Sequence, residues 1–403
     1  MGEVARSGST TYHAATVEAG RSEVSQGLRV AAVAPLTVNG GRRVGTNVEL
    51  FGRVCRSRAP VLPALLTVSL AAPPVSATQN APKGFWSDPS PLSIEIEADL
   101  YGLRVEDRHP DAAPRPGVLR VLSDPPSEVR VLLETRGRFR LDRSNCRYPP
   151  LRVTILADSV ERLPAALADF GRRARLVWSC RPGQEDLVRL EYAAYRIRGA
   201  LDHWTYRVRP AKARFIDRSG RDETHETWVF FREGNAHLRP RLGVEEVELP
   251  DSVAVDPAVI SQVPAALNEV FQYLIGNTDW SVSARHNQRL VVTPLGEYRT
   301  VPYDFDSSGF VDAPYATPGS YLPTTDVTER LFRGLCRPSA VYIQAIEKIA
   351  AEEPALLAVI DSIPELSEGR AREARRYLSE FFREARRPDR LARYFGSACQ
   401  ERN

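Results

Sequence analysis

Apolar and polar residues alternate along several stretches of the first half of the chain. Leu92-Ser-Ile-Glu-Ile-Glu-Ala98 is the clearest case, because every second residue is apolar, which is typical of a strand with one buried face. Further strands are expected where short apolar runs are bounded by turn signals such as Arg136-Gly137 and Pro149-Pro150, namely at Val129–Leu133, Leu151–Ile155, Arg175–Trp178, Thr205–Arg209 and Thr227–Phe231. The first half is therefore expected to be rich in β-structure.

One segment of this half changes to a period of three to four residues. Its apolar stripe consists of Leu187, Leu190, Ala194, Ile197 and Leu201. Glu191 lies beside this stripe. The pattern predicts one main helix between the strands.

The second half turns helical near Pro264, a residue that suits the first turn of a helix. One continuous apolar face follows, made of Leu267, Val270, Phe271, Leu274 and Ile275, and it runs into Gly276-Asn-Thr-Asp279. A hairpin is expected next, with strands at Leu290–Thr293 and Glu297–Val301 and a Pro294-Leu-Gly296 turn, and it leads into Pro302-Tyr-Asp-Phe-Asp306. From Asp326 to Tyr394 the pattern is again helical.

This order of parts is that of a protein kinase. Phosphoryl transfer needs a carboxylate that orients the attacking hydroxyl, and an Asn and a second Asp that hold Mg²⁺ against the phosphates. A hairpin between the two acidic loops returns the chain to the same edge, so we expect Asp279, Asn287 and Asp304 to converge. Asp279 is the candidate catalytic residue, Asn287 and Asp304 are candidate metal ligands, and Asp306 is an additional one.

Each of these motifs also has a simpler interpretation. Asn287 could cap the strand that follows it, and His286 beside it is interpreted as structural. An Asp-Phe-Asp sequence in a turn is often a solvated Asx turn. It is the order and spacing of the motifs that favour a kinase-like site.

The same segments resemble the CotH family of bacterial secreted and spore-coat kinases. A helix-loop like FxxYxLxxxLxGNxD in that family resembles Phe271–Asp279 here, and its WDFD resembles Tyr303-Asp-Phe-Asp306. Its Lys-bearing strand and LLRNxLAYEL-like helix resemble Arg175–Cys180 followed by Leu187–Arg196. The chain is also similar to a group of uncharacterised bacterial proteins with an RGxxR…C…PPLR pattern, here Arg136–Arg140, Cys146 and Pro149–Arg152.

The resemblance implies an α+β, bilobal protein-kinase-like fold. A β-rich N-lobe with one main helix would span residues 92–235, and a mostly helical C-lobe would span residues 236–403. It further implies ATP and Mg²⁺ (or Mn²⁺) as cofactors, with four residues assigned to nucleotide binding: Arg136, Gly137, Arg175 and Glu191.

Arg175 stands where the family has a lysine. An arginine can contact phosphates and pair with Glu191, but its planar fork does not reproduce the geometry of an ammonium group. Arg173 and Arg152 are alternatives for the phosphate contact.

Three functions therefore remain open. The first is an ATP- and Mg²⁺-dependent kinase that acts on a protein or on cell-envelope material, which the retained acidic residues favour. The second is a degenerate kinase fold that binds nucleotide, metal or a protein partner without transfer, which Arg175 favours. The third is a calcium-binding structural or adhesion protein.

Charge argues against a nucleic-acid partner. The 403-residue chain has a formal net charge of +3, from 54 basic and 51 acidic residues. Residues 1–77 hold eight Arg and four Glu, so the remainder has 46 basic and 47 acidic residues, a net charge of −1. The basic footprint expected of a DNA- or RNA-binding surface is missing from that remainder.

An export signal begins about fifty residues into the chain. Basic Cys55-Arg-Ser-Arg58 precedes the apolar run Ala59–Ala72 and a small-x-small site that ends at Ala77. We interpret residues 1–53 as a leader or a misplaced start, 54–77 as a signal peptide and 78–91 as a linker. The mature protein would begin near Thr78 and be secreted or periplasmic.

The alternative is that Leu62–Leu70 is a buried element of a cytoplasmic protein. After Ala77 no apolar run is long enough to span a membrane.

Export changes the interpretation of the cysteines. The mature chain keeps four, and an even number in an oxidising compartment favours disulfides over buried thiols. They fall in pairs along the chain, which predicts Cys146–Cys180 in the first half and Cys336–Cys399 in the second. Neither pair has the spacing of a zinc site.

Overall fold

The computed structural model describes residues 84–400, with the exception of residues 124, 138, 161 and 162. The expected leader (1–53) and signal peptide (54–77) lie outside the described residues. Of the expected linker, the described part begins at Gly84. Phe85 and Trp86 are already buried there, and Trp86 Nε1 donates a hydrogen bond to the Asp169 carbonyl at 2.7 Å.

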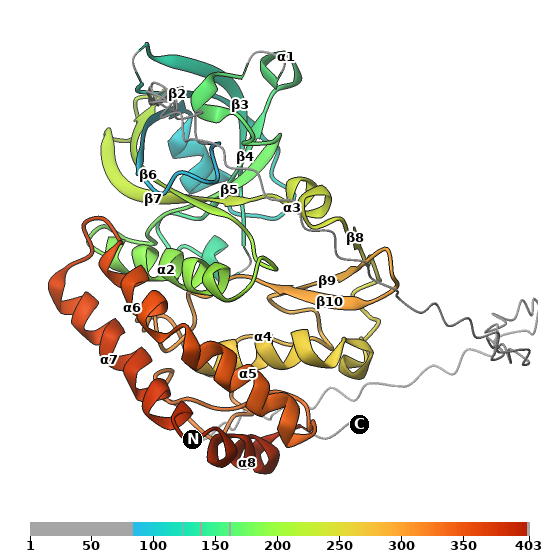
Figure 1. Ribbon diagram of the computed structural model, residues 1–403. Coiled ribbons are helices and arrows are strands. Elements are labelled where there is room, and N and C mark those ends of the chain that lie inside the picture. Colours follow the sequence, from blue (N-terminus) through green and yellow to red (C-terminus); the bar gives the residue numbers. More distant parts are fainter. Residues whose placement is uncertain (1–83, 124, 138, 161–162, 401–403) are drawn as a thin grey trace, which may run out of the picture. The chain divides into compact units, whose positions relative to one another are not determined.

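The first half forms a closed barrel, the upper part of Figure 1. Its strands are β1 (Leu92–Ala98), β2 (Arg115–Val121), β3 (Ser127–Thr135), β4 (Leu151–Ile155), β5 (Arg173–Val177), β6 (Val208–Asp217) and β7 (His225–Glu233). They follow the order β1-β2-β3-β4-β5-β7-β6, and β6 closes the sheet by pairing in parallel with β1, whereas the other neighbours are antiparallel.

The alternating pattern fills the inside of this barrel. Ile94 and Ile96 are each 1% exposed, whereas Glu95 between them reaches an arginine on the outside, Arg214. Burying every second residue is what a period of two requires. Strand β2 was not expected, because Pro116 and Gly117 interrupt its pattern.

Helix α2 (Glu185–Leu201) is the main helix of the β-rich half, as expected. Its buried side chains join a hydrophobic core that continues into the second half, while the barrel has a separate core of its own. Shorter elements are α1 (Ala157–Val160), a π-type turn η1 (Gly102–Glu106) and the 3₁₀ turns η2 (Phe139–Leu141), η3 (Ala165–Leu167) and η4 (Pro257–Val259). Helix α2 therefore lies between strands of the barrel in the sequence, but its side chains pack against residues of both halves.

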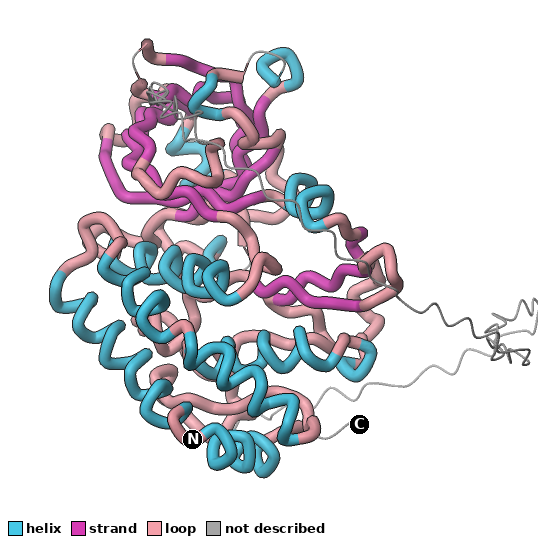
Figure 2. The backbone as a smooth tube through the Cα atoms, viewed as in Figure 1, coloured by secondary structure: helices cyan, strands magenta, loops and turns pink. Residues whose placement is uncertain are grey.

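The second half is mostly helical, so the α+β fold class, with a β-rich N-terminal region and a helical C-terminal region, is confirmed (Figure 2). Its helices are α3 (Asn235–Leu242), α4 (Gln262–Leu274), α5 (Ser339–Ala351), α6 (Glu353–Asp361), α7 (Glu368–Ala385) and α8 (Pro388–Ala398). A small sheet in the order β10-β9-β8 consists of β8 (Glu245–Glu246), β9 (Gln288–Val292) and β10 (Tyr298–Pro302). We refer to residues 92–233 as the barrel region and to residues 235–400 as the helical region.

The expected hairpin is confirmed as β9 paired antiparallel with β10. The expected start of the last helical segment at Asp326 is wrong, since residues 326–338 form loops and α5 begins only at Ser339. Pro338 precedes that helix directly, and a proline is well suited to the start of a helix but not to its interior.

Both expected disulfides are present. Cys146–Cys180 joins the loop after β3 to the segment before α2, and Cys336–Cys399 joins the loop before α5 to the end of α8. Each bridge thus stays within one half of the chain.

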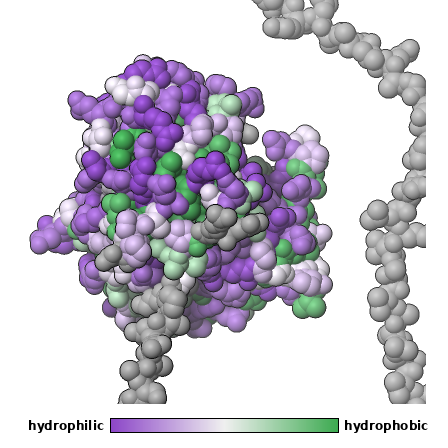
Figure 3. Space-filling model, turned by 90° about the horizontal axis from the view of Figure 1, so that it is seen from above, coloured by the Kyte–Doolittle hydropathy of each residue, from purple (hydrophilic) through white to green (hydrophobic). Residues whose placement is uncertain are grey.

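The face of the molecule in Figure 3 is mostly hydrophilic, with small separate hydrophobic spots. Among the described residues, no helix has the length and apolar character needed to cross a membrane.

Candidate active site

The Gly276–Asp279 loop follows directly from the end of α4. Gly276 has φ +60°, and a Cβ at this position would collide with the Tyr377 hydroxyl, so only glycine fits. Asn277 is buried. Its side chain accepts the Asp279 N–H at 2.9 Å and donates to Gln272 Oε1 at 2.9 Å, which fixes the turn.

This loop lies against the segment that follows β10. The Gly309 N–H donates to the Gly276 carbonyl at 3.1 Å, and Asn277 forms an isolated bridge with Ser308. The two acidic loops are therefore held side by side by backbone pairing.

Asp279 and Asn287 are in direct contact. Asn287 Nδ2 donates to the Asp279 carbonyl at 2.8 Å and to Asp279 Oδ2 at 3.1 Å. His286 Nε2 lies 2.8 Å from Asp279 Oδ1, so both carboxylate oxygens of Asp279 are oriented by neighbours. The Asp279 side chain is nonetheless 47% exposed and accessible to an incoming group.

Asp304 is tied to the same cluster through the backbone. The Tyr303 N–H donates to the Asn287 carbonyl at 3.1 Å, and the Asp304 N–H donates to the hydroxyl of Tyr195 in α2 at 2.9 Å. Asn287 (φ 53°) and Asp304 (φ 64°) both have left-handed backbones. Asn and Asp tolerate this conformation better than most residues, and such strain is often found at functional sites.

Asp306 lies in a second cluster. It forms an ion pair with Arg140 from η2, and Arg140 Nη2 also lies 3.7 Å from Glu191 Oε2 in α2. Burial alone would lower the pKa of Arg140, but mainly the charge of Asp306 raises it well above its usual value. Burial raises the pKa of Glu191 to about 8, although Arg140 acts in the opposite direction.

Glu191, which Arg175 could pair with, forms an ion pair with Arg140. The loop that carries Arg140 is fixed by the guanidinium of Arg108, which donates to the carbonyls of Arg140 and Cys146, each at 2.9 Å. The Cys146–Cys180 disulfide anchors the same loop. Because the loop is fixed at these points, Arg140 can contact both Glu191 of the barrel region and Asp306 of the helical region.

Arg175 lies on β5 directly opposite Arg232 of β7. Burial lowers the pKa of Arg175, and the positive charge of Arg232 lowers it further, whereas Asp304 acts in the opposite direction. Arg175 thus has a like charge as its cross-strand neighbour and, among the described residues, no ion pair with a carboxylate.

The other two residues assigned to nucleotide binding are Arg136 and Gly137. Arg136 pairs with Glu134 at 2.9 Å, and its backbone N–H donates to the Pro150 carbonyl at 2.8 Å. Gly137 opens the next loop with φ +107°. Among the described residues, neither has a hydrogen bond or ion pair with Asp279, Asn287 or Asp304.

Asn287 and Asp304 offer oxygen atoms of the kind that bind a divalent cation such as Mg²⁺. With Nδ2 of Asn287 used as a donor, its Oδ1 is left to face a cation, and Asp304 offers a carboxylate; oxygen ligands of this kind are those that Mg²⁺ prefers. No group of three or more His, Cys, Asp or Glu side chains within the described residues could hold a metal by itself.

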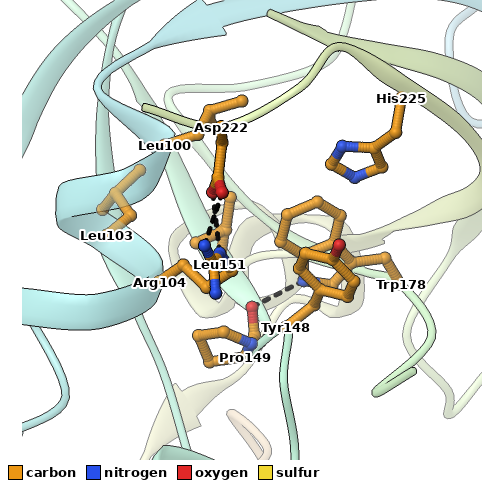
Figure 4. A pocket seen from close by; sticks show the side chains of 9 residues that line it. All are labelled: Leu100, Leu103, Arg104, Tyr148, Pro149, Leu151, Trp178, Asp222 and His225. Carbon is orange, nitrogen blue, oxygen red and sulfur yellow. Dashed lines mark hydrogen bonds and ion pairs between the residues drawn. The ribbon is translucent and has the colours of Figure 1, made fainter. Parts of the chain in front are cut away.

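A separate pocket lies in the barrel region, and none of the predicted site residues lines it (Figure 4). Arg104 and Asp222 form an ion pair across it, and Trp178 Nε1 donates to the Pro149 carbonyl at 2.6 Å. These polar groups are thus paired, whereas Nε2 of His225, which also lines the pocket, has no hydrogen-bond partner among the described residues.

Sequence reasoning missed several residues of the site, above all Arg140, Arg232 and Tyr195. Arg140 is the second arginine of the RGxxR pattern. Arg232 ends the apolar run of β7, and a charged residue in a buried strand is itself a signal of function. Tyr195 sits on the helical face with Glu191, four residues later.

Comparison with solved structures finds distant structural likenesses. The chain is similar to the crystal structure of a Helicobacter pylori proinflammatory kinase, CtkA, with a TM-score of 0.36 and 12% sequence identity over 60% of this chain and 91% of that chain. No protein-family model and no curated protein sequence matches the chain. The interpretation of the site therefore depends on its own geometry.

Proposed function

We propose that the chain is a secreted or periplasmic phosphotransferase of the CotH type. It would use ATP with Mg²⁺ or Mn²⁺ and act on a protein or cell-envelope substrate. The observation that carries the proposal is the convergence of Asp279, Asn287 and Asp304, from two loops separated by a hairpin, through direct and backbone hydrogen bonds.

Asp279 orients the acceptor hydroxyl in this proposal. It is the most exposed of the three residues, and contacts from His286 and Asn287 hold its carboxylate in one orientation. A positioned carboxylate can accept the hydroxyl proton as the new bond to phosphorus forms.

Asn287 Oδ1 and the Asp304 carboxylate would hold the metal. When bound, Mg²⁺ supplies positive charge that neutralises the phosphate oxygens. Tyr195 and the Asn287 carbonyl keep the Asp304 backbone in place, so α2 of the barrel region supports a ligand of the helical region. Asp306, the expected additional ligand, is engaged by Arg140, and we assign it first to the contact between the two regions.

The two disulfides support the proposed compartment, because such bonds persist mainly in oxidising environments.

Calorimetric titration of the exported chain with ATP, with and without MgCl₂, tests the proposal. We expect binding that depends on the divalent metal. Absence of nucleotide binding with either Mg²⁺ or Mn²⁺ would refute it, and Ca²⁺ binding without nucleotide would favour the calcium-binding alternative.

A degenerate kinase fold is the second candidate, favoured by Arg175 in place of the usual lysine. Arg175→Lys separates the two candidates in a phosphate-transfer assay. Activity that is kept or raised in the variant would mean that the arginine is a tolerated replacement. Nucleotide binding without transfer, in both the wild type and the variant, would favour the degenerate fold.

A further inference from the structure

Arg232 is a buried cation whose hydrogen-bonding groups are largely unused. Its side chain is 5% exposed, and its Nε and Nη1 atoms have no hydrogen-bond partner. The next residue, Glu233, shows the contrast: it is fully buried but pairs with Arg241 at 2.7 Å and with His237 at 2.6 Å. At the end of β7, Glu233 is therefore paired, whereas the adjacent Arg232 has two nitrogen atoms without a partner in the described part of the chain.

The direction of Arg232 follows from strand geometry. Side chains two residues apart in a strand share a face. Phe230 packs against the rings of Tyr192 and Tyr195 in α2, so Arg232 projects to the same side of the sheet. There its guanidinium lies 4.3 Å from the ring centre of Tyr206 and 5.1 Å from that of Tyr303, the residue before Asp304.

A second arginine faces the same place. Arg175 is the cross-strand partner of Arg232, and like charges directly opposite each other in a sheet destabilise it. Asp304 is the carboxylate whose charge reaches both guanidiniums, yet among the described residues neither arginine forms an ion pair with a carboxylate. Two cations thus lie near Asp304 without an ion pair, and Glu191, whose charge also interacts with Arg232, is already paired with Arg140.

The edge of the cluster is partly exposed. Arg175, Tyr303 and Asp304 each keep some exposed surface, whereas Arg232 is 5% exposed. A phosphate group presents several oxygens to the N–H groups of a guanidinium, and a bidentate contact of this kind is the one that arginine makes best.

We propose that Arg232, together with Arg175, binds a phosphate group of the polyphosphate chain of the nucleotide. This inference rests on the proposed function for the identity of the ligand. The anion would separate the two like charges and accept hydrogen bonds from Nε and Nη1 of Arg232. Two arginines, Arg175 and Arg232, would then share the phosphate contact for which the CotH family has a lysine.

The experiment compares Arg232→Met with Arg209→Met. Arg209 is also 5% exposed and lies on the neighbouring strand β6, but it is paired with Asp88 and donates to the Phe85 carbonyl. Binding of pyrophosphate and of ATP with MgCl₂ is measured by calorimetry, and melting is measured without ligand.

We expect Arg232→Met to weaken binding of both ligands by about 10- to 100-fold, the range for lost hydrogen bonds to a charged group. Its melting temperature should stay close to that of the wild type, because an unpaired buried charge has been removed. Arg209→Met should show the reverse, with a lower melting temperature and unchanged affinity. Arg232→Lys, which keeps the charge, should recover part of the affinity.

Unchanged affinity in Arg232→Met would overturn the inference and assign Arg232 to a structural role between two tyrosines. Failure of the wild type to bind both pyrophosphate and ATP would overturn it as well. Pyrophosphate binding that depends on Arg232, in a chain that binds no ATP, would support the anion site while refuting the proposed nucleotide function.

Discussion

The barrel region and the helical region bring mainly opposite charges to the site. The barrel contributes Arg140, Arg175 and Arg232 with one carboxylate, Glu191, whereas the helical region contributes Asp279, Asp304 and Asp306. Like charges within a region repel, as the opposed arginines of β5 and β7 illustrate. Between the regions, opposite charges attract, most directly where Arg140 meets Asp306.

This difference indicates what kind of ligand the site suits. A simple anion would neutralise only the arginines, and a simple cation would neutralise only the aspartates. A phosphate group accompanied by a metal ion carries both charges, so it complements both sides at once. Variants that remove one side should therefore have different consequences from variants that remove the other.

The largest effect is expected from the acidic side. If Asp304 holds the metal, Asp304→Ala should abolish metal-dependent nucleotide binding and, with it, transfer. Asp279→Ala should leave nucleotide affinity nearly unchanged while lowering turnover about 10²- to 10⁴-fold, the range for a positioned general base. Calorimetry and a steady-state transfer assay measure the two quantities separately.

Asp326→Ala serves as the control for these variants, since Asp326 is an aspartate of the same region that only orders its own turn through Thr328. Ligand-free melting should be similar in all three variants. Equal loss of nucleotide affinity in Asp304→Ala and Asp279→Ala would contradict the division of roles.

The contact between the two sides should give the next largest effect. Arg140→Met leaves the Asp306 carboxylate buried without its partner, which typically costs about 3–5 kcal/mol of unfolding free energy. Adding Asp306→Asn should recover part of this loss, because the uncompensated charge is removed. Urea denaturation of the single and double variants measures the coupling.

Arg120→Met is the matched control for Arg140. Arg120 pairs with Glu97 on the outer surface of the barrel, where a partly exposed pair contributes about 1 kcal/mol or less. If Arg140→Met is no more destabilising than this control, the contact of Arg140 with Asp306 contributes no more to the free energy of unfolding than a partly exposed ion pair does.

The disulfides should show the smallest effect. Replacing either cysteine pair with alanine should cost about 2 kcal/mol, the lower end of the usual range, because the domain is large. Only loss of Cys146–Cys180 should also weaken nucleotide binding, since this bridge anchors the loop of Arg140. Melting curves and calorimetry on both variants test the difference, and equal affinities in the two would argue against it.

The fold was predictable where the pattern is local. The alternation in β1, the stripe of α2 and the hairpin β9–β10 follow from periods and spacings within short stretches of sequence. The two disulfides, whose cysteines are 34 and 63 residues apart, were predicted from the number and order of the cysteines and from the expected export. Strand β2 was not predicted, because Pro116 and Gly117 break its alternating pattern. It forms nonetheless, because its pairing with β1 and β3 outweighs that local preference.

The site was predictable only in part, for a related reason. Asp279, Asn287 and Asp304 are joined by a short hairpin, so their convergence follows from local structure. The partners of Arg140 lie on α2 and after β10, and the register of β5 turns Arg175 towards Arg232. Contacts between distant segments of this kind depend on the closed sheet and leave little trace in the local sequence.

The parallel pairing of β1 with β6 has a consequence for how the chain folds. Strands β2 to β5 and helix α2 all come between these two partners in the sequence, so this seam joins residues of high contact order. During synthesis β1 can pair with β2, but its other edge stays open until β6 has emerged. An open strand edge is a template for pairing with other chains. A nascent chain that stops before β6 should therefore aggregate, and completion of β6 is the step that protects it.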